Sequence, residues 1–556
     1  MKKHCVIVVV ALLADLVLAP VSVFAGGVSE APMSVEKTAV KSEIKNVIML
    51  IPDGMSMDGV TLARWFQGGM PLALDPLASG LVRTYNADTL IADSAPAATA
   101  FATGYKTNSP YIGVLPSKAG LWGVPEVTVP FRPVASVLEA ARLSGRSVGL
   151  VATCELPHAT PADFSAHAPN RKNYDDILEQ QVYNSLSVVF SGGYKFLDSA
   201  NRKDKEDLAA ELVKQGYRLI KTKQEFDALK ETGVEKVWGL FAPVDLAYDI
   251  DRDPAAEPSL AEMTSKAIAL LSQNPHGFFL MVEGSKIDWA AHANEPVALV
   301  HDILAFDKAV EAAVKFASSR NDTVVIISSD HGNSGITMGN QSTSSGYDKV
   351  PLDTFIKPLQ AARKSGSVFA SLLDESKSNV QNVLASVYGI QDASAEEIEQ
   401  IKTAKIDEWT GMTLVGQLIA KRAKIGFTTG GHTGEDVVLY QYAPLGAKKL
   451  SGTVQNNDIA WYMAELMGLD LKGTTQRLFA DAKELFAGVS AVLETNMTDP
   501  ANPVLVVKAN GKELLLPVNK NYGMLNGTPV QLDGVTVYIN ETKSWYVSSR
   551  ALDVIK

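Results

Sequence analysis

The sequence predicts an α/β fold in which a large, mostly parallel sheet is sandwiched between helices. Four apolar runs are too uniform for half-exposed strands, and they end in polar residues or glycine; they lie at 45–54, 147–153, 277–284 and 323–332. Such runs are typical of strands that are covered on both faces. Segments with helical character separate the runs, and this alternation of strand and helix favours a parallel sheet.

The remaining elements of this fold follow in chain order. An extended segment is expected over 80–85 and a last strand of the sheet over 437–442. Helices are expected over 60–66, 133–143, 174–190, 286–294 and 296–318. The alternating charges of residues 204–230 are typical of a solvated face. Because such sheets place their sites at the carboxyl ends of the strands, the polar residues there are the first candidates for a site.

Two segments depart from this pattern. From about 335 to 411 the chain is rich in charged helix formers, and we expect a helical insertion that is either a lid over the site or an ordinary surface excursion. From about 497 to 556 short apolar runs return. Asn510-Gly511, Asn526-Gly527 and Asp533-Gly534 are hairpin signals there, so the sequence predicts a small all-β module at the C-terminus.

Residues 1–25 have the features of a secretory signal peptide. Two lysines precede an apolar stretch from Val6 to Leu18, and Val23-Phe24-Ala25 fits a cleavage site. The alternative is an uncleaved anchor, but this apolar stretch is short for a membrane span. We therefore expect a periplasmic or secreted protein with no membrane span after cleavage, and a main domain that covers residues 26–490.

The chain has a formal charge of −11, which limits its partners. Nucleic acids and anionic membranes both require basic patches, so neither is expected to bind. An anionic substrate would also be repelled unless metal ions or a buried arginine gave the site its own positive charge. Loss of the signal peptide would leave Cys154 as the single cysteine, so no intramolecular disulfide is expected.

The stretch from Asp93 to Ala100 places a serine at the start of a predicted helix. Small helix formers follow Ser94, and Pro96 lies where the first turn tolerates proline. Backbone N–H groups and the helix dipole at such a position favour an anion, above all a phosphate. On this stretch alone two interpretations are open: Asp93 or Ser94 is only a helix cap, or Ser94 is a nucleophile.

Carboxylates and histidines recur near the ends of the predicted strands. Asp288 and His292 are four residues apart, so on a helix they share a face and can bind one metal ion. Asp330-His331 offers a second such pair, and Asp53 and Glu283 end two other strands. Each residue alone is compatible with a cap, an ion pair or a hydrogen-bonded histidine. Together they supply enough ligands for two or three ions, which could clamp the attacking and leaving oxygens of a phosphoryl transfer.

At this point the chain resembles the alkaline phosphatase family. Six separated motifs agree with that family in type and order: Asp53-Gly54, Asp93-Ser94, His158-Ala159-Thr160-Pro161, Glu283-Gly284 with Asp288 and His292, Asp330-His331, and His432-Thr433-Gly434. The resemblance implies that residues 26–490 form a catalytic domain with the fold of that family. It also implies hydrolysis of phosphate monoesters through a phosphoserine, at a site with two Zn²⁺ and one Mg²⁺, with release of inorganic phosphate.

The resemblance gives each of these residues a role. Ser94 resembles the nucleophile, Arg171 the arginine that clamps phosphate, and Asp93 the carboxylate that orients it. The implied ligands are Asp288, His292 and His432 for the first zinc; Asp53, Asp330 and His331, with Ser94, for the second; and Asp53, Thr160 and Glu283, beside His158, for the magnesium. His158 stands where some members carry aspartate, which could change the ion at the third site. Homodimers are common in the family, although the insertion could block that interface.

Two other functions compete with this interpretation. A phosphodiesterase, or another phosphoryl- or sulfuryl-transfer enzyme, could use the same fold, but Thr160, Glu283 and Arg171 together favour the terminal, dianionic phosphate of a monoester. A non-catalytic surface-binding protein that uses the β module would not need an intact ligand set. The histidines outside the motifs are expected to be ordinary loop or surface residues; they are His167, His276 and His301.

Overall fold

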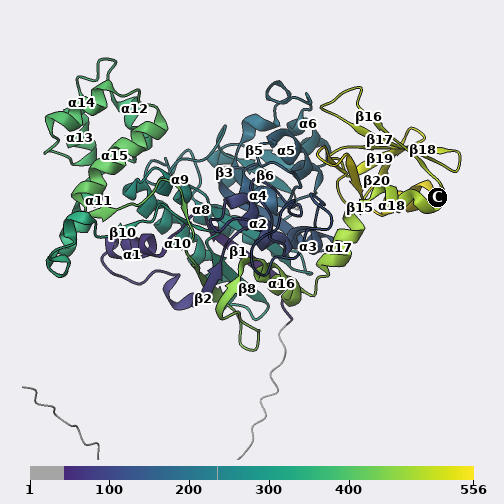
Figure 1. Ribbon diagram of the computed structural model, residues 1–556, viewed down its shortest axis with the longest axis horizontal. Coiled ribbons are helices and arrows are strands. Elements are labelled where there is room, and N and C mark those ends of the chain that lie inside the picture. The colour runs from purple at the N-terminus through teal and green to yellow at the C-terminus, as the bar shows by residue number, and fades with distance from the viewer. Residues whose placement is uncertain (1–42, 234–235) are drawn as a thin grey trace, which may run out of the picture. The chain divides into compact units, whose positions relative to one another are not determined.

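The computed structural model describes residues 43–233 and 236–556, which contain a ten-stranded sheet (Figure 1). The predicted signal peptide lies outside the described residues. Along the sheet the strand order is β14-β2-β13-β8-β1-β7-β3-β4-β6-β5. The strands are β1 Asn46–Pro52, β2 Ala78–Arg83, β3 Ser147–Glu155, β4 Val188–Gly192, β5 Arg218–Ile220, β6 Val237–Leu240, β7 Phe278–Gly284, β8 Thr323–Ser328, β13 Val437–Tyr442 and β14 Gly452–Gln455.

Most neighbouring strands of this sheet are parallel. β1 pairs in parallel with both β7 and β8, and β3 pairs in parallel with β7 and β4. β13 is reversed, since it runs antiparallel to β8 and to β2. The predicted, mostly parallel sheet is therefore confirmed. Because β13 is reversed, its first residues lie at the edge where β8, β1, β7 and β3 end.

Helices cover both faces of the sheet, as predicted. Along β1, Ile48 and Leu50 pack into one hydrophobic cluster, whereas Val47 and Met49 pack into another on the opposite face. The first cluster includes residues of α1 Met57–Phe66, α8 Leu260–Leu271 and α10 Pro296–Ser318. The second includes residues of α3 Val137–Leu143, α5 Tyr174–Tyr183, α6 Leu208–Lys214, α16 Asn456–Met467 and α17 Leu471–Leu478.

One predicted helix is partly wrong. The segment 174–190 was expected to be helical throughout, but α5 ends at Tyr183 and β4 begins at Val188. Ser185 between them has a φ of +58°, a left-handed conformation that a continuing α-helix does not contain. Every residue of β4 is buried, so its apolar run has no period that separates strand from helix.

The segment after Gly335 is helical, as predicted, and its helices form a group drawn in green in Figure 1. They are α11 Leu352–Ala361, α12 Phe369–Leu372, α13 Val380–Tyr388, α14 Ala395–Thr403 and α15 Glu408–Arg422. Phe369, Leu384 and Ile419 are buried in the same hydrophobic cluster as α1 and α10. The segment is therefore packed onto the main core and not attached only by its ends.

The C-terminal strands form two antiparallel sheets, drawn in yellow in Figure 1. The strands are β15 Ala480–Asp481, β16 Val492–Asn496, β17 Val504–Ala509, β18 Lys512–Pro517, β19 Tyr522–Leu525, β20 Thr528–Gln531, β21 Val537–Ile539 and β22 Ser544–Val547, with α18 Ala482–Phe486 and α19 Arg550–Ile555 beside them. Asn510-Gly511 and Asn526-Gly527 form the predicted hairpin turns. Asp533-Gly534 does not, because it follows β20 and precedes β21, which pairs with β22 instead.

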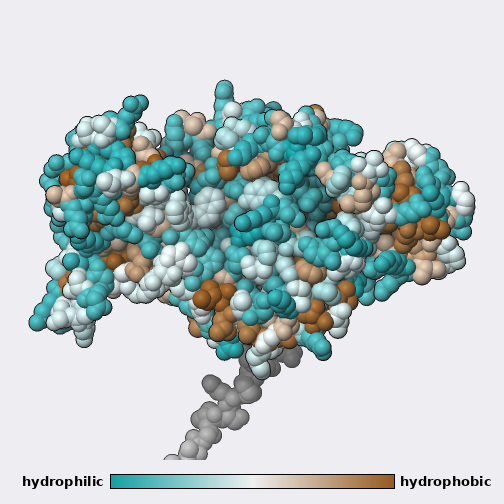
Figure 2. Space-filling view, turned by 45° about the horizontal axis from the view of Figure 1, so that its top comes forward, coloured by the Kyte–Doolittle hydropathy of each residue, from teal (hydrophilic) through white to brown (hydrophobic). Residues whose placement is uncertain are grey.

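Hydrophilic side chains predominate on the face of the molecule shown in Figure 2, and the hydrophobic ones form small separate groups. Scattered apolar residues of this kind are normal on protein surfaces. Across residues 43–233 and 236–556, no helix is both long and apolar enough to cross a membrane.

Candidate active site

The predicted ligands come from segments that meet at the carboxyl edge of the sheet. β8, β1, β7 and β3 are adjacent, so the residues that follow them lie close together. His432 arrives from the other direction, on β12 His432–Thr433, which pairs with β9 Gly332–Asn333. The side chains form three groups of candidate metal ligands; they are Asp288, His292 and His432; Asp53, Asp330 and His331; and Cys154, His158 and Glu283.

In the first group, one carboxylate and two imidazoles converge. Asp288 and His292 lie on α9 Lys286–His292, and their Oδ2 and Nε2 atoms are 3.3 Å apart. His432 Nε2 lies 3.6 Å from Asp288 Oδ1 and 2.9 Å from His292 Nε2. Nitrogen and oxygen ligands on a tetrahedral Zn²⁺ ion are separated by about 3.3 Å, so these distances fit one ion.

The other ring nitrogens of these two histidines contact backbone carbonyl groups. His292 Nδ1 lies 2.8 Å from Gly430 O, and His432 Nδ1 lies 2.7 Å from Ala92 O. Donation by Nδ1–H to a carbonyl leaves Nε2 as the atom that can bind a metal. Gly54 allows the close approach of this region: its φ is +64°, and a Cβ there would lie 2.4 Å from Asp288 Oδ1.

The second group is completely buried. His331 Nε2 lies 3.4 Å from Asp53 Oδ1 and 3.2 Å from Asp330 Oδ2. Both carboxylate oxygens of Asp53, and Oδ2 of Asp330, make no hydrogen bond. Unpartnered carboxylate oxygens are costly to bury, so this donor set fits a cation.

Ser94 joins the second group from the start of α2 Ser94–Thr103. Its Oγ lies 3.2 Å from His331 Nε2, and the side chain is buried. Asp93 is the N-cap residue of this helix, but its carboxylate makes no capping hydrogen bond. Instead it accepts hydrogen bonds from Arg171 Nη1, at 2.8 Å, and from Ser109 Oγ, at 2.7 Å. Asp93 thus holds Arg171 close to Ser94, and the cap interpretation of its side chain is excluded.

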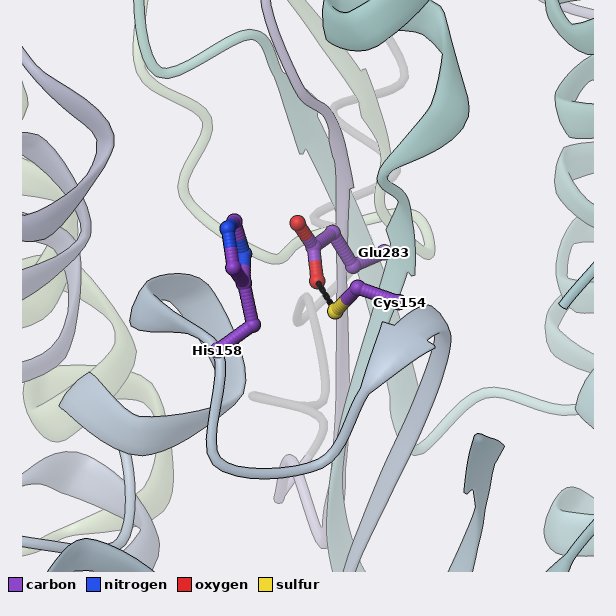
Figure 3. A group of neighbouring side chains, drawn as sticks. All are labelled: Cys154, His158 and Glu283. Carbon is purple, nitrogen blue, oxygen red and sulfur yellow. Dashed lines mark hydrogen bonds between the residues drawn. The ribbon is translucent and has the colours of Figure 1, made fainter. Parts of the chain in front are cut away.

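The third group lies at the end of β3 and β7 (Figure 3). Cys154 Sγ lies 3.3 Å from Glu283 Oε2. His158 precedes α4 Ala159–Asp163, which carries Thr160. The Nε2 atom of His158 contacts Arg171 Nη2 at 3.0 Å. His158 therefore connects this group with the arginine.

The pKa values show the effect of burying like charges together. Burial, with the neighbouring carboxylates of Asp330 and Asp288, raises the pKa of Asp53 well above its usual range. Burial, with Asp288 nearby, raises the pKa of Asp330 to about 7. For His292, burial lowers the pKa, but the hydrogen bond and charge of Asp288, with the Gly430 carbonyl and Asp93, together raise the value to about 9. Several positive charges are therefore required before all these carboxyls ionise.

Two residues that contact the site were not expected from the sequence. Asn333 donates hydrogen bonds from Nδ2 to Asp288 Oδ1, at 2.6 Å, and to Asp288 O, at 3.2 Å, and so orients that carboxylate. Cys154 was not assigned to a metal ion from the sequence, although it opens the ligand-rich loop that leads to His158. The prediction that His167 is an ordinary loop or surface residue is wrong, because it is buried and its Nε2 contacts Glu139 Oε1 at 3.1 Å.

Comparisons with known proteins show which family this chain belongs to. A family model described as alkaline phosphatase matches residues 44–469. Alkaline phosphatase 4 of Bacillus subtilis is 36% identical over 456 residues, which cover 79% of this chain and 92% of that protein. The Thermus thermophilus alkaline phosphatase structure is 27% identical with a TM-score of 0.67, and the match covers 80% of this chain and 96% of that one.

A third comparison concerns a mutant alkaline phosphatase from the Antarctic bacterium TAB5, whose structure has Mg bound in the M3 site. It is 25% identical with a TM-score of 0.55, and the match covers 77% of this chain and 99% of that one. The family match covers most of the chain and includes all three groups of ligands. This chain therefore belongs to the alkaline phosphatase family, and it is a metal-dependent phosphatase that hydrolyses phosphate monoesters.

Proposed function

We propose that Ser94 is the nucleophile of this phosphatase and that catalysis passes through a phosphoserine. The observation that carries this proposal is the position of Ser94 Oγ, which is buried at a helix start and lies 3.2 Å from His331 Nε2. Ser94 attacks the phosphorus atom, and the alcohol of the substrate leaves. Water then cleaves the phosphoserine, which releases inorganic phosphate and restores the serine.

We infer two Zn²⁺ ions and a third divalent cation, for which Mg²⁺ is the ion implied by the resemblance and the one named for the TAB5 mutant structure. Asp288, His292 and His432 would hold the first ion; Asp53, Asp330 and His331, with Ser94, the second; and Asp53, Thr160 and Glu283, beside His158, the third. When bound, such ions offset the charge of the phosphate and favour the ionised form of the serine hydroxyl.

Arg171 would bind the phosphate oxygens that face away from these groups. Its guanidinium is fixed by Asp93 at 2.8 Å and lies beside His158 at 3.0 Å, so its direction is defined before substrate binds. A planar, charged donor suits a dianionic phosphate. The rival phosphodiesterase function fits less well, because a diester replaces one of the charged oxygens with a second substituent.

We also propose that residues 1–25 are a signal peptide, that residues 26–490 are the catalytic domain, and that residues 497–556 are a separate β module of an exported protein. The sequence supports this proposal through its basic start, its short apolar stretch and the Val23-Phe24-Ala25 motif. A homodimer is proposed from the resemblance. N-terminal sequencing of the mature protein and sedimentation analysis test the two proposals separately.

Trapping of the phosphoenzyme tests the central proposal. Wild-type enzyme quenched in acid during turnover of a labelled monoester should retain label on Ser94, and Ser94→Ala should lose both the label and most turnover. Metal content and the melting temperature of the variant serve as controls, and both should stay near wild type. Turnover near wild type in Ser94→Ala would rule out the covalent route.

A further inference from the structure

The third group of ligands contains a cysteine in a place where a sulfur atom can reach a metal ion. Cys154 lies at the end of β3, whose Ala152 is in register with Glu283 of β7. The Cys154 and Glu283 side chains point toward each other, and the His158 ring faces the carboxylate (Figure 3). One potential ligand atom from each of the three residues lies within 4.8 Å of the other two.

Several polar atoms around this thiol are buried and have no partner. Glu283 Oε1, Thr160 Oγ1 and His158 Nδ1 make no hydrogen bond, and Glu283 and Thr160 are fully buried. The Cys154 thiol is also fully buried, and it donates to Glu283 Oε2 at 3.3 Å. Unpaired buried donors and acceptors are rare in native proteins, so this concentration of them indicates that a bound ion completes the site.

We propose that Cys154 is a ligand of the third ion and that the site therefore selects Zn²⁺ over Mg²⁺. This inference rests on the proposed three-ion centre, but it does not depend on the role of Ser94. The donors would be Cys154 Sγ and the Glu283 carboxylate, with His158 and Thr160 completing the set; in this arrangement Cys154 replaces Asp53, the ligand that the resemblance implies.

The chemistry of the donors favours this choice of ion. Mg²⁺ binds oxygen ligands and keeps several waters, whereas Zn²⁺ binds thiolate, imidazole and carboxylate together. On a tetrahedral Zn²⁺ ion a sulfur and an oxygen ligand are separated by about 3.5 Å. The observed 3.3 Å between Cys154 Sγ and Glu283 Oε2 is close to that separation. The pair can thus bind one ion with little movement.

Ion binding at this site would release a proton. The S–H bond of Cys154 breaks, its sulfur keeps the electron pair and donates it to the cation, and the proton passes to the solvent. The thiolate and the Glu283 carboxylate together then balance the charge of a divalent cation. A purely structural thiol would instead keep its proton and continue to donate a hydrogen bond to Glu283.

Cobalt substitution distinguishes these two states. Metal-free wild-type enzyme should be titrated with Co²⁺ alone, and a near-ultraviolet band of thiolate-to-cobalt charge transfer should grow with the third equivalent. Cys154→Ser, which keeps a hydroxyl at the same place, should lack the band. Its preference for Zn²⁺ over Mg²⁺ at the third site should fall at least tenfold, measured as bound metal after dialysis against both ions.

The outcomes separate this inference from the proposed function. Two results would overturn the role of Cys154 alone. One is an enzyme that binds three ions and forms the labelled phosphoenzyme but lacks the charge-transfer band. The other is a wild-type enzyme that holds two Zn²⁺ and one Mg²⁺ under competition. Failure to bind ions at all would instead overturn the metal centre. The wild-type spectrum decides the question even if Cys154→Ser folds poorly.

Discussion

Arg171, the proposed phosphate-binding residue, is held in place by its neighbours. Its guanidinium contacts Asp93 on one side and His158 on the other, and it is only partly exposed. The Asp93 carboxylate is partly buried, which raises its pKa, but Arg171, the hydrogen bond from Ser109 and two nearby histidines together lower the pKa below its usual value. Asp93 therefore stays ionised at neutral pH and keeps the guanidinium in one orientation. A phosphate can bind without first ordering this side chain.

Arg171→Ala should reduce kcat/KM for a phosphate monoester by about 10- to 150-fold, because it removes a charged hydrogen bond worth about 1.5–3 kcal/mol. Slow hydrolysis of a matched diester should change much less. Lys172→Ala is the control, since the neighbouring Lys172 side chain is exposed and should leave both rates unchanged. Steady-state kinetics on both esters decides the point, and equal losses on both would remove the reason to prefer a monoesterase.

The sequence revealed those site residues whose chemistry is visible in a short motif. Asp288 and His292 share a helix face because they are four apart, and Asp53 and Asp330 follow buried strands. Asn333 could not be found in this way, because its contact with Asp288 depends on β9 and α9 meeting in space. Cys154 was visible but ambiguous, since a buried thiol is more often a small apolar residue than a ligand.

At the scale of elements, α3 shows how a polar network supports the core. Glu139 closes a capping box with Ser136, whose backbone N–H donates to its carboxylate at 2.9 Å. The same carboxylate contacts His167 Nε2 and accepts from Asn184 Nδ2, each at 3.1 Å. Glu139 is fully buried, so three partners hold a charge that would otherwise be costly.

Glu139→Ala should lower the free energy of unfolding by about 3–5 kcal/mol at neutral pH, because it breaks this buried network. Burial raises the pKa of Glu139, but His167, the hydrogen bond from Ser136 N–H and Arg142 together outweigh burial, so the net shift of the pKa is downward. The stabilisation is therefore present above the unfolded pKa and is lost as pH falls through the lower, folded value. Urea melts at several pH values test this. Glu225→Ala, in the exposed capping box of α7 Lys223–Asp227, is the control and should cost about 1 kcal/mol or less.

The insertion places an aromatic ring beside the site. Trp409 lies in the first turn of α15, its ring centroid is 6.5 Å from that of His292, and half of its surface is exposed. An exposed ring beside a proposed ligand histidine can pack against the leaving group of a substrate. This contact favours the lid over the ordinary surface excursion for that part of the insertion.

Trp409→Ala should lower kcat/KM for an aryl phosphate by about 3- to 10-fold, the value of one aromatic contact of about 0.5–1.5 kcal/mol. Hydrolysis of an alkyl phosphate should stay near wild type, because it offers no ring to pack. Trp65→Ala, on α1 and similarly exposed, should affect neither substrate. A loss that is equal for aryl and alkyl substrates would show that Trp409 acts on the fold of the rim.

Elements with a clear pattern of apolar residues were predicted well. Elements whose type or direction depends on the segments they pack against were not. α10 and the buried strands β1 and β8 appear where the apolar pattern indicates. The reversal of β13 could not be predicted, since a buried run has the same pattern in either direction. β4 was assigned to a helix for a similar reason: both its faces are buried, so its run carries no alternation.

At the scale of the whole molecule, buried ion pairs attach the C-terminal strands to the catalytic core. Lys520, which follows β18, pairs with both Glu179 of α5 and Glu206. Asn519 accepts at Oδ1 from Gln180 Nε2, at 3.0 Å, and donates to Glu179. Because α5 directly follows the segment that carries Arg171, the C-terminal strands support the region that is proposed to bind phosphate.

Removal of ions from the proposed metal centre should destabilise the whole molecule in a pH-dependent way. Burial raises the pKa of Asp53 well above its usual range and that of Glu283 and Asp330 to about 7, and the hydrogen bond to Asp288 raises that of His292 to about 9. The metal-free folded protein therefore holds protons that the unfolded chain, whose carboxyls ionise near pH 4, has already lost.

Below about pH 6.5 the unfolded chain gains protons on its histidines, which offsets the extra protons of the folded state. Burial lowers the pKa of His158, His331 and His432, so the folded protein does not gain these protons. Above about pH 6.5 the unfolded histidines are neutral, and within the metal centre the groups with raised pKa values set the direction of the effect. The folded state then binds more protons, so its stability falls as pH rises toward 9. By calorimetry, the melting temperature of the chelated enzyme should drop by several degrees between pH 6.5 and 9. The enzyme saturated with Zn²⁺ should not show this drop, since bound cations replace those protons. If chelation lowered the melting temperature by the same amount at both pH values, the proposed buried centre that holds protons in place of cations would be contradicted.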